Sequence, residues 1–143
     1  MECIHIYVDG SCEENRNVTA ETPAGWGFAV VDGDTGLGRG RGDIVYESSG
    51  IVLTNSNLPG FIGAEVGSNN TAELSAIAQA LRWILESGDC ECVVIRADSQ
   101  YALNIATGEW RAKKNRALAE RVQALWNEVS TICELRGEHV RAH

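Results

Sequence analysis

Short apolar segments separated by turn residues fill the first part of the chain. Residues 3–8 are apolar on both faces, which is typical of a central strand, and residues 25–31 predict a second strand. Residues 43–54 hold one or two further strands. Consecutive strands with no helix between them predict an antiparallel meander. The connections are expected as a loop at 10–24 and a hairpin turn at 32–36, while 61–66 could return to the sheet.

From Asn70 onward the apolar spacing changes to that of a helix. Apolar side chains recur every three or four positions up to Leu85, and Gly88 is a suitable end for this helix. The later elements are expected as a strand at 92–97, a short helix at 101–106, an amphipathic helix over 118–132 and a final strand at 138–142. The resulting order of strands and helices predicts an α/β fold with a mixed five-stranded sheet flanked by helices.

Length and composition fit one globular domain. A chain of 143 residues with 44% hydrophobic residues can bury a core. No run of about 18 apolar residues is present, so no membrane partner is expected. The N-terminal residues do not read as a secretory signal. We therefore expect an intracellular protein, in the cytoplasm or with the nucleoid or nucleus.

The five cysteines are scattered along the chain. Their odd number and irregular spacing argue against a disulfide framework and favour a reducing compartment. Cys90 and Cys92 form a C-x-C pair, but no second Cys/His pair lies near it in the sequence. A zinc site is therefore not expected.

The net charge of −8 is unusual for a protein that binds nucleic acid, but the charge is unevenly distributed. Residues 1–98 hold 5 basic and 15 acidic side chains, whereas residues 99–143 hold 7 basic and 5 acidic ones. Much of the basic charge gathers between Arg111 and Arg121. A polyanion could approach from that side.

Three acidic residues stand where predicted elements begin or end. Asp9 closes the first strand, Glu73 is expected in the first turn of a helix, and Asp98 closes a later strand. Each has an ordinary structural interpretation: a turn at Asp9, reciprocal capping between Asn70 and Glu73, and a helix cap at Asp98. Carboxylates placed where elements meet are also the ligands that Mg²⁺ prefers. Each acid alone is therefore weak evidence for a metal site.

The strings around these acids resemble a known family. D-G-S at 9–11, N-N-x-x-E-L at 69–74 and D-S-Q-Y at 98–101, in this order, are similar to the motifs of the type 1 ribonuclease H family. The similarity extends from Asp9 to His143. It implies a ribonuclease H-like fold and a metal-dependent endonuclease that hydrolyses the RNA strand of RNA/DNA hybrids.

The resemblance also implies the roles of the acids. Asp9, Glu73 and Asp98 would be catalytic residues and metal ligands, in a complete site that holds two Mg²⁺ or Mn²⁺ ions. Water would attack the phosphate in line and leave 3′-hydroxyl and 5′-phosphate ends. His143 would correspond to the family's mobile catalytic histidine.

The family's fourth carboxylate is expected after His143, where the sequence stops. Residues 1–143 are therefore expected to form a single ribonuclease H-like domain that is truncated at its C-terminus and cleaves poorly. Two alternatives stay open: a catalytically impaired module that binds hybrids, and the ribonuclease H domain of a reverse transcriptase. A transposase or integrase core fits the motifs less well. Residues 38–63 exceed the family's short connection, and their role is open, as is the oligomeric state.

The resemblance further indicates substrate-binding residues. Neutral amides both donate and accept hydrogen bonds, so they can engage 2′-hydroxyls and base edges in a minor groove. The segment W-R-A-K-K-N-R at 110–116 resembles the part of the family that grips the DNA strand's phosphates. The expected substrate-binding residues are Ser11, Asn15, Asn69, Asn70, Gln100, Trp110, Lys113, Lys114 and Asn115.

Overall fold

The computed structural model describes residues 3–33, 42–88 and 90–141. Its strands are β1 (Ile4–Cys12), β2 (Ala24–Asp32), β3 (Asp43–Ile51), β4 (Cys92–Ala97) and β5 (Glu134–His139). Its helices are α1 (Asn69–Ser87), α2 (Gln100–Thr107) and α3 (Arg116–Ser130). The predicted order of elements is confirmed.

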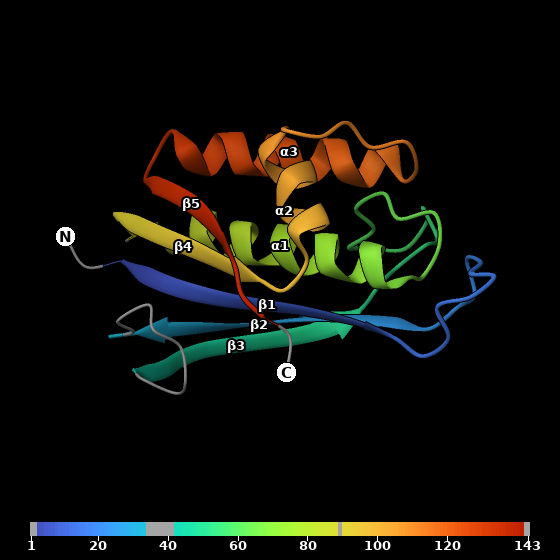
Figure 1. Ribbon diagram of the computed structural model, residues 1–143, viewed down its shortest axis with the longest axis horizontal. Coiled ribbons are helices and arrows are strands. Elements are labelled where there is room, and N and C mark those ends of the chain that lie inside the picture. The colour runs from blue at the N-terminus through green and yellow to red at the C-terminus, as the bar shows by residue number, and fades with distance from the viewer. Residues whose placement is uncertain (1–2, 34–41, 89, 142–143) are drawn as a thin grey trace.

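The strands form one five-stranded sheet in the order β3-β2-β1-β4-β5. β1, β2 and β3 pair antiparallel as the predicted meander, while β4 and β5 run parallel to β1. The three helices lie together on one side of the sheet (Figure 1). The predicted mixed sheet is therefore confirmed, and β1 is its central strand.

The core lies between the helices and this face of the sheet. The strands supply alternate side chains such as Ile6, Val30 and Ile95, and α1 supplies residues such as Ile77 and Leu81, all with no exposed surface. The alternation of strand residues places every second side chain on the same face. The core thereby fixes which strand residues face the helices and which face the other way.

β1 is longer than predicted. It pairs with β4 only from Ile4 to Tyr7, but its pairing with β2 continues to Cys12. The predicted loop at 10–24 therefore begins too early, and Asp9 lies within the strand instead of at its end. Turn-forming residues such as Gly10 did not end β1 because β2 provides a hydrogen-bonding partner at each of these positions.

Two other boundaries differ from the prediction. Residues 61–66 form no strand; Gly63 has a φ of 117° and packs against the start of α3, where an added Cβ would lie 2.7 Å from the Leu118 nitrogen. β5 spans Glu134–His139 and not 138–142, because its parallel pairing with β4 begins at Cys92↔Glu134. The prediction missed β5's early residues because Leu135 is the one apolar side chain there, between the charged Glu134 and Arg136.

Serine residues begin two of the helices. Ser68 is the N-cap of α1 and exchanges hydrogen bonds with Thr71, so Asn70 does not have the capping role predicted for it. Ser99 is the N-cap of α2 and accepts from the Ala102 main chain, which leaves Asp98 without that capping role. Both caps satisfy main-chain N–H groups that a helix start leaves unpaired.

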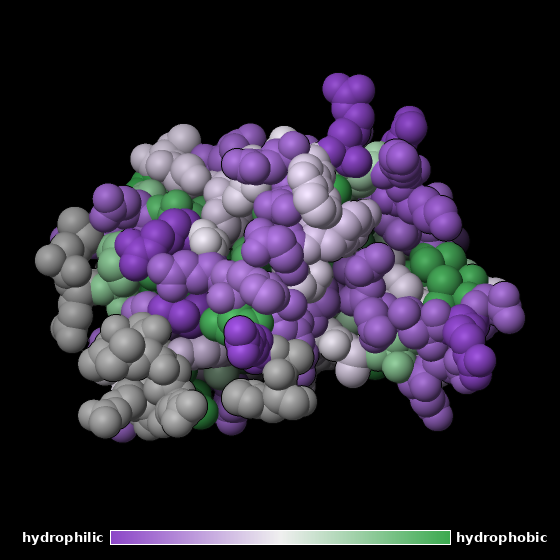
Figure 2. All heavy atoms as spheres, viewed as in Figure 1, coloured by the Kyte–Doolittle hydropathy of each residue, from purple (hydrophilic) through white to green (hydrophobic). Residues whose placement is uncertain are grey.

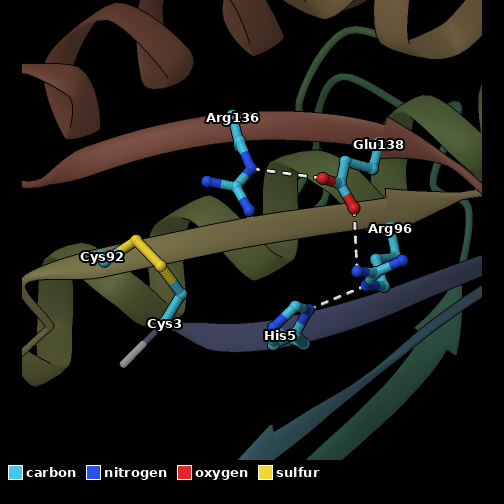
Figure 3. Close-up of a disulfide and its surroundings, with 6 residues drawn as sticks. All are labelled: Cys3, His5, Cys92, Arg96, Arg136 and Glu138. Atoms are coloured by element: carbon cyan, nitrogen blue, oxygen red, sulfur yellow. Dashed lines mark hydrogen bonds and ion pairs between the residues drawn. A yellow bond between two sulfur atoms is a disulfide. The ribbon is translucent and has the colours of Figure 1, made fainter. Parts of the chain in front are cut away.

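The other face of the sheet carries a disulfide and a polar network (Figure 3). Cys3 and Cys92 form a disulfide between β1 and β4, so the prediction of reduced cysteines is wrong for this pair. Arg96, which is 7% exposed, donates from Nε to His5 Nδ1 at 2.8 Å and pairs with Glu138 at 2.8 Å. These contacts join β1, β4 and β5 on the side opposite the helices.

The surface has mainly hydrophilic character on the face seen in Figure 2, where apolar side chains occur in small separate areas. Among the described residues no helix has the length and apolar character needed to cross a membrane. Large apolar side chains are most exposed on β3, one of the two edge strands, where Ile44 is 61% and Ile51 is 72% exposed.

Candidate metal centre and nucleic-acid interface

Asp9, Glu73 and Asp98 meet at one edge of the sheet. Each offers a carboxylate oxygen, and these oxygens lie within 4.8 Å of one another. β1 and β4 are parallel neighbours, so residues that follow their paired segments emerge at the same edge. Asp9 lies just beyond the β1–β4 pairing, and Asp98 lies between β4 and α2. Glu73 reaches them from α1, where it is the fifth helical residue and not in the first turn as predicted.

Glu73 is held by the main chain of β1. It is only 5% exposed, and its Oε1 accepts a hydrogen bond of 2.7 Å from the Gly10 N–H. An added Cβ on Gly10 would lie 2.5 Å from the Glu73 nitrogen, so α1 can approach β1 this closely only at a glycine. The other oxygen, Oε2, is buried and has no hydrogen-bond partner among the described residues.

The surroundings of Glu73 disfavour its negative charge. Burial, together with the neighbouring charges of Asp98 and Asp9, raises the pKa of Glu73 to about 8, although the Gly10 hydrogen bond acts in the opposite direction. A divalent cation would reverse this effect, because it would neutralise the clustered acids and give Glu73 Oε2 a partner. Three hard oxygen donors and an unsatisfied buried oxygen therefore fit a Mg²⁺ or Mn²⁺ ion.

The predicted amide residues lie near the start of α1 and α2. Asn15 Oδ1 accepts from the Asn69 N–H at 3.0 Å, which joins the loop after β1 to the first residue of α1. Gln100 donates to Asn104 Oδ1 at 3.2 Å on the exposed side of α2. Asn15, Asn69, Asn70 and Gln100 are all exposed. Their amide groups are thus accessible to a ligand, although some also have structural contacts.

A depression of about 740 Å³ lies beside these amides. Lys113 and Lys114 line it together with Trp110, which is 50% exposed. Tyr101, from α2, contacts Trp110 edge to face with ring centroids 6.1 Å apart. Asn15 and Asn70 line the same depression, so one surface combines amides, aromatic rings and basic side chains.

Some predicted residues have other positions or contacts. Asn115 accepts a hydrogen bond from the Glu65 N–H at 3.1 Å and precedes α3 with a φ of 52°, so it has a structural role at the rim of the depression. Ser11 lines a separate depression with residues 20–25. His143 lies outside the described residues.

Two contributors to this region were missed from the sequence. The Gly10 N–H, which holds Glu73, could have been found from the glycine that follows Asp9, since close backbone approach often requires glycine. Tyr101 was predicted as the start of a helix and as the last residue of the D-S-Q-Y motif, without a ligand-facing role. Its contact with Trp110 depends on how the loop after α2 folds back. No sequence spacing indicates that contact.

The sequence and fold of this protein are similar to those of known proteins. The family model described as RNase H matches residues 1–143. RNase H1 from the halophilic archaeon Halobacterium salinarum NRC-1 is 25% identical, with a TM-score of 0.65 over 96% of this chain and 85% of that one. No match was found among curated proteins.

Two further solved structures have lower identity and the same fold. LC11-RNase H1, isolated from compost by a metagenomic approach and solved in complex with an RNA/DNA hybrid, is 24% identical, with a TM-score of 0.64 over 96% of this chain and 85% of that one. The RNase H domain of prototype foamy virus is 16% identical, with a TM-score of 0.63 over 100% and 81%. Given the match over its whole length, the chain belongs to the type 1 ribonuclease H family.

Proposed function

We propose that this protein is an endoribonuclease that binds RNA/DNA hybrids and hydrolyses the RNA strand with two divalent ions, Mg²⁺ or Mn²⁺. The observation that carries the proposal is the convergence of Asp9, Glu73 and Asp98, with one buried Glu73 oxygen lacking a protein partner. The ions would supply an activated water molecule and would stabilise negative charge on the scissile phosphate.

The chain's own residues prepare this site. The Gly10 N–H fixes one oxygen of Glu73, while burial and the two aspartates favour its protonated form. Protons and cations would therefore compete for Glu73, and binding of an ion would release a proton. The cluster consists of carboxylates, which would hold divalent ions, and such ions supply water as the attacking nucleophile.

The depression beside α1 and α2 supports a nucleic-acid substrate. Lys113 and Lys114 supply positive charge for phosphates, and the exposed Trp110 supplies an aromatic surface against a sugar or base. Asn15 and Asn70 line the same depression, and Asn70 precedes Glu73 by three positions on α1, so these amides would meet the minor groove and its 2′-hydroxyls. The hybrid complex of LC11-RNase H1 supports the same substrate class.

The test is cleavage of a hybrid whose RNA strand is labelled, with duplex DNA and duplex RNA of the same sequence as controls. We expect cleavage of the hybrid only, dependent on Mg²⁺ or Mn²⁺, with 5′-phosphate products. Asp9→Asn and Asp98→Asn should each lower the rate about a hundredfold or more, whereas Arg121→Ala, an exposed change on α3, should leave cleavage intact. Cleavage that persists in EDTA or in both aspartate variants would contradict the proposal.

A second candidate is a module that binds hybrids without cleaving them. It is favoured by the observation that three carboxylates, and no fourth, gather at this site among residues 3–33, 42–88 and 90–141. The same assay separates the two candidates if it is paired with a binding measurement. Hybrid binding without cleavage in either metal would favour the second.

A further inference from the structure

The end of β5 lies against the segment that carries Asp98. The Val140 N–H donates to the Ala97 carbonyl at 2.8 Å, and His139 Nε2 lies 2.8 Å from the Asp98 carbonyl oxygen. These two acceptors are consecutive main-chain carbonyls at the point where β4 passes into α2. Two residues of β5's end therefore hold the peptide groups on both sides of the Asp98 Cα.

The direction of the His139 bond follows from its partner. A main-chain carbonyl only accepts hydrogen bonds, so Nε2 must carry the hydrogen and donate it. His139 is an exposed residue, so core packing does not account for the position of its ring. The ring is hydrogen-bonded to Asp98, the residue that lies beside Asp9 and Glu73.

The fold fixes His139 so that it can make this contact. Its main chain pairs in register with Ala97, which is fully buried. Two residues earlier, Gly137 lies so close to α2 that an added Cβ would be 2.8 Å from Leu103 Cδ2. β5 is thus held in place here by its pairing with β4 and its packing against α2. The main chain of His139 is therefore fixed, which lets its ring reach the Asp98 carbonyl.

Asp98 itself lies between two regular elements. β4 ends at Ala97, and the cap Ser99 begins α2, so Asp98 is the single residue between the strand pairing and the cap. The orientation of its side chain depends on the rotation of its peptide groups. A donor attached to its carbonyl restricts that rotation.

We propose that His139 is a positioning residue for the candidate metal centre, in which its Nε2–H holds the Asp98 peptide so that the Asp98 carboxylate stays beside Asp9 and Glu73. The inference rests on the proposed function, because that function requires these three acids to bind a divalent ion. His139 would touch neither ion nor substrate and would act only through Asp98.

The chain offers a matched set of variants. Glutamine at 139 places an amide N–H at the same number of bonds from Cα as His Nε2, so His139→Gln keeps a donor that can reach the Asp98 carbonyl. His139→Asn carries the same amide one bond closer to the main chain and cannot reach it in the same way. His139→Ala removes the donor, and Glu134→Ala is a control at the exposed start of β5.

The experiment is calorimetric titration of each metal-free variant with Mn²⁺, without nucleic acid, together with its melting temperature in EDTA. We expect His139→Ala and His139→Asn to weaken Mn²⁺ binding about tenfold. This is the lower end of the loss seen when a residue that orients a metal ligand is removed, because His139 bonds the main chain of Asp98 and not its carboxylate. His139→Gln and Glu134→Ala should bind as the unchanged protein does. The three His139 variants should melt at similar temperatures.

Unchanged Mn²⁺ affinity in His139→Ala would overturn the inference, as would a His139→Gln variant as weak as His139→Asn. A loss of affinity that follows the melting temperature across the variants would also overturn it, since it would show a purely structural effect. Absence of Mn²⁺ binding by the unchanged protein would instead contradict the proposed metal centre itself. Failure of the metal centre can be distinguished from failure of the His139 inference, because Asp9→Asn would then have no effect on the Mn²⁺ titration.

Discussion

The Gly10 N–H donates a hydrogen bond of 2.7 Å to Glu73 Oε1, across 63 positions of sequence. It joins the central strand to the helix that packs on it, and it places the most buried acid of the cluster. The contact requires a residue without a side chain in β1, because α1 lies directly over Gly10. Fold and candidate site therefore depend on the same close approach.

The first prediction concerns this approach. Gly10→Ala should lower the free energy of unfolding by about 2–3 kcal/mol, because the new Cβ would lie 2.5 Å from the Glu73 nitrogen and 2.6 Å from the Ala72 carbonyl carbon, both main-chain atoms. It should also weaken Mn²⁺ binding by displacing Glu73. Urea unfolding and calorimetric titration measure the two effects.

Gly27→Ala is the matched control for this change. Gly27 pairs with Asp9 in the same sheet, but its added Cβ would meet nothing nearer than 3.7 Å. We expect a much smaller loss of stability there. If both variants unfold at the same urea concentration, the close approach at Gly10 does not limit the packing of α1.

The second prediction concerns pH. The pKa of Glu73 is about 8 in the folded protein against an ordinary value of 4.5, so the folded state binds more protons between these values. The free energy of unfolding of the metal-free protein should therefore fall as pH rises from about 4.5 to about 8. Glu73→Gln should remove this contribution and be the more stable protein at pH 8 in EDTA.

Chemical unfolding at a series of pH values, with and without Mg²⁺, measures this effect. Mg²⁺ should reduce the fall in the unchanged protein, because it favours the ionised acids. Parallel pH profiles for Glu73→Gln and the unchanged protein would show that Glu73 titrates normally. The pH profile of the variant serves as the baseline for all other titrating groups.

The third prediction concerns the basic surface. In the variant with both Lys113→Ala and Lys114→Ala, the slope of log affinity for hybrid against log salt concentration should decrease in magnitude by about 1–2, since each phosphate contact releases roughly one counterion. Fluorescence anisotropy at several salt concentrations measures the slope.

Arg121→Ala, which removes one positive charge, is the comparison for this measurement. Arg121 is exposed on α3 but does not line the depression that contains the two lysines. Its removal should change the slope little. An equal change for each charge removed in the two variants would indicate a general effect of net charge instead of contacts within the depression.

The fourth prediction concerns the disulfide. Cys3→Ser should lower the free energy of unfolding by about 2–4 kcal/mol, because the bond joins positions 89 residues apart and restricts the unfolded chain. A reducing agent should destabilise the unchanged protein by a similar amount. The same agent should have no effect on Cys3→Ser, and an effect of equal size there would contradict the assignment.

The sequence predicted the order of elements and the meeting of the three acids for a clear reason. Apolar periodicity, which changes at Asn70, predicted the order of elements, and the resemblance of the strings around the acids to one family's motifs implied that the acids meet. Asp9 and Asp98 meet because β1 and β4 are parallel neighbours. Their roles as metal ligands remain predictions.

Several details depend on partners that the sequence does not reveal. β1 continues past Gly10 because β2 pairs with it, and residues 61–66 leave the sheet because Gly63 packs against α3. The Cys3–Cys92 disulfide depends on the register between β1 and β4, which fixes which cysteines face each other. Spacing along the chain does not determine that register.

The central position of β1 has a consequence for the folding pathway. Its parallel pairing with β4 joins residues separated by most of the chain's length, so this contact has high contact order and a large entropic cost of loop closure. Asp9 and Asp98 cannot approach until that pairing forms. A paramagnetic ion such as Mn²⁺ would therefore report on late assembly during refolding, because no early intermediate limited to the β1–β2–β3 meander contains the complete cluster.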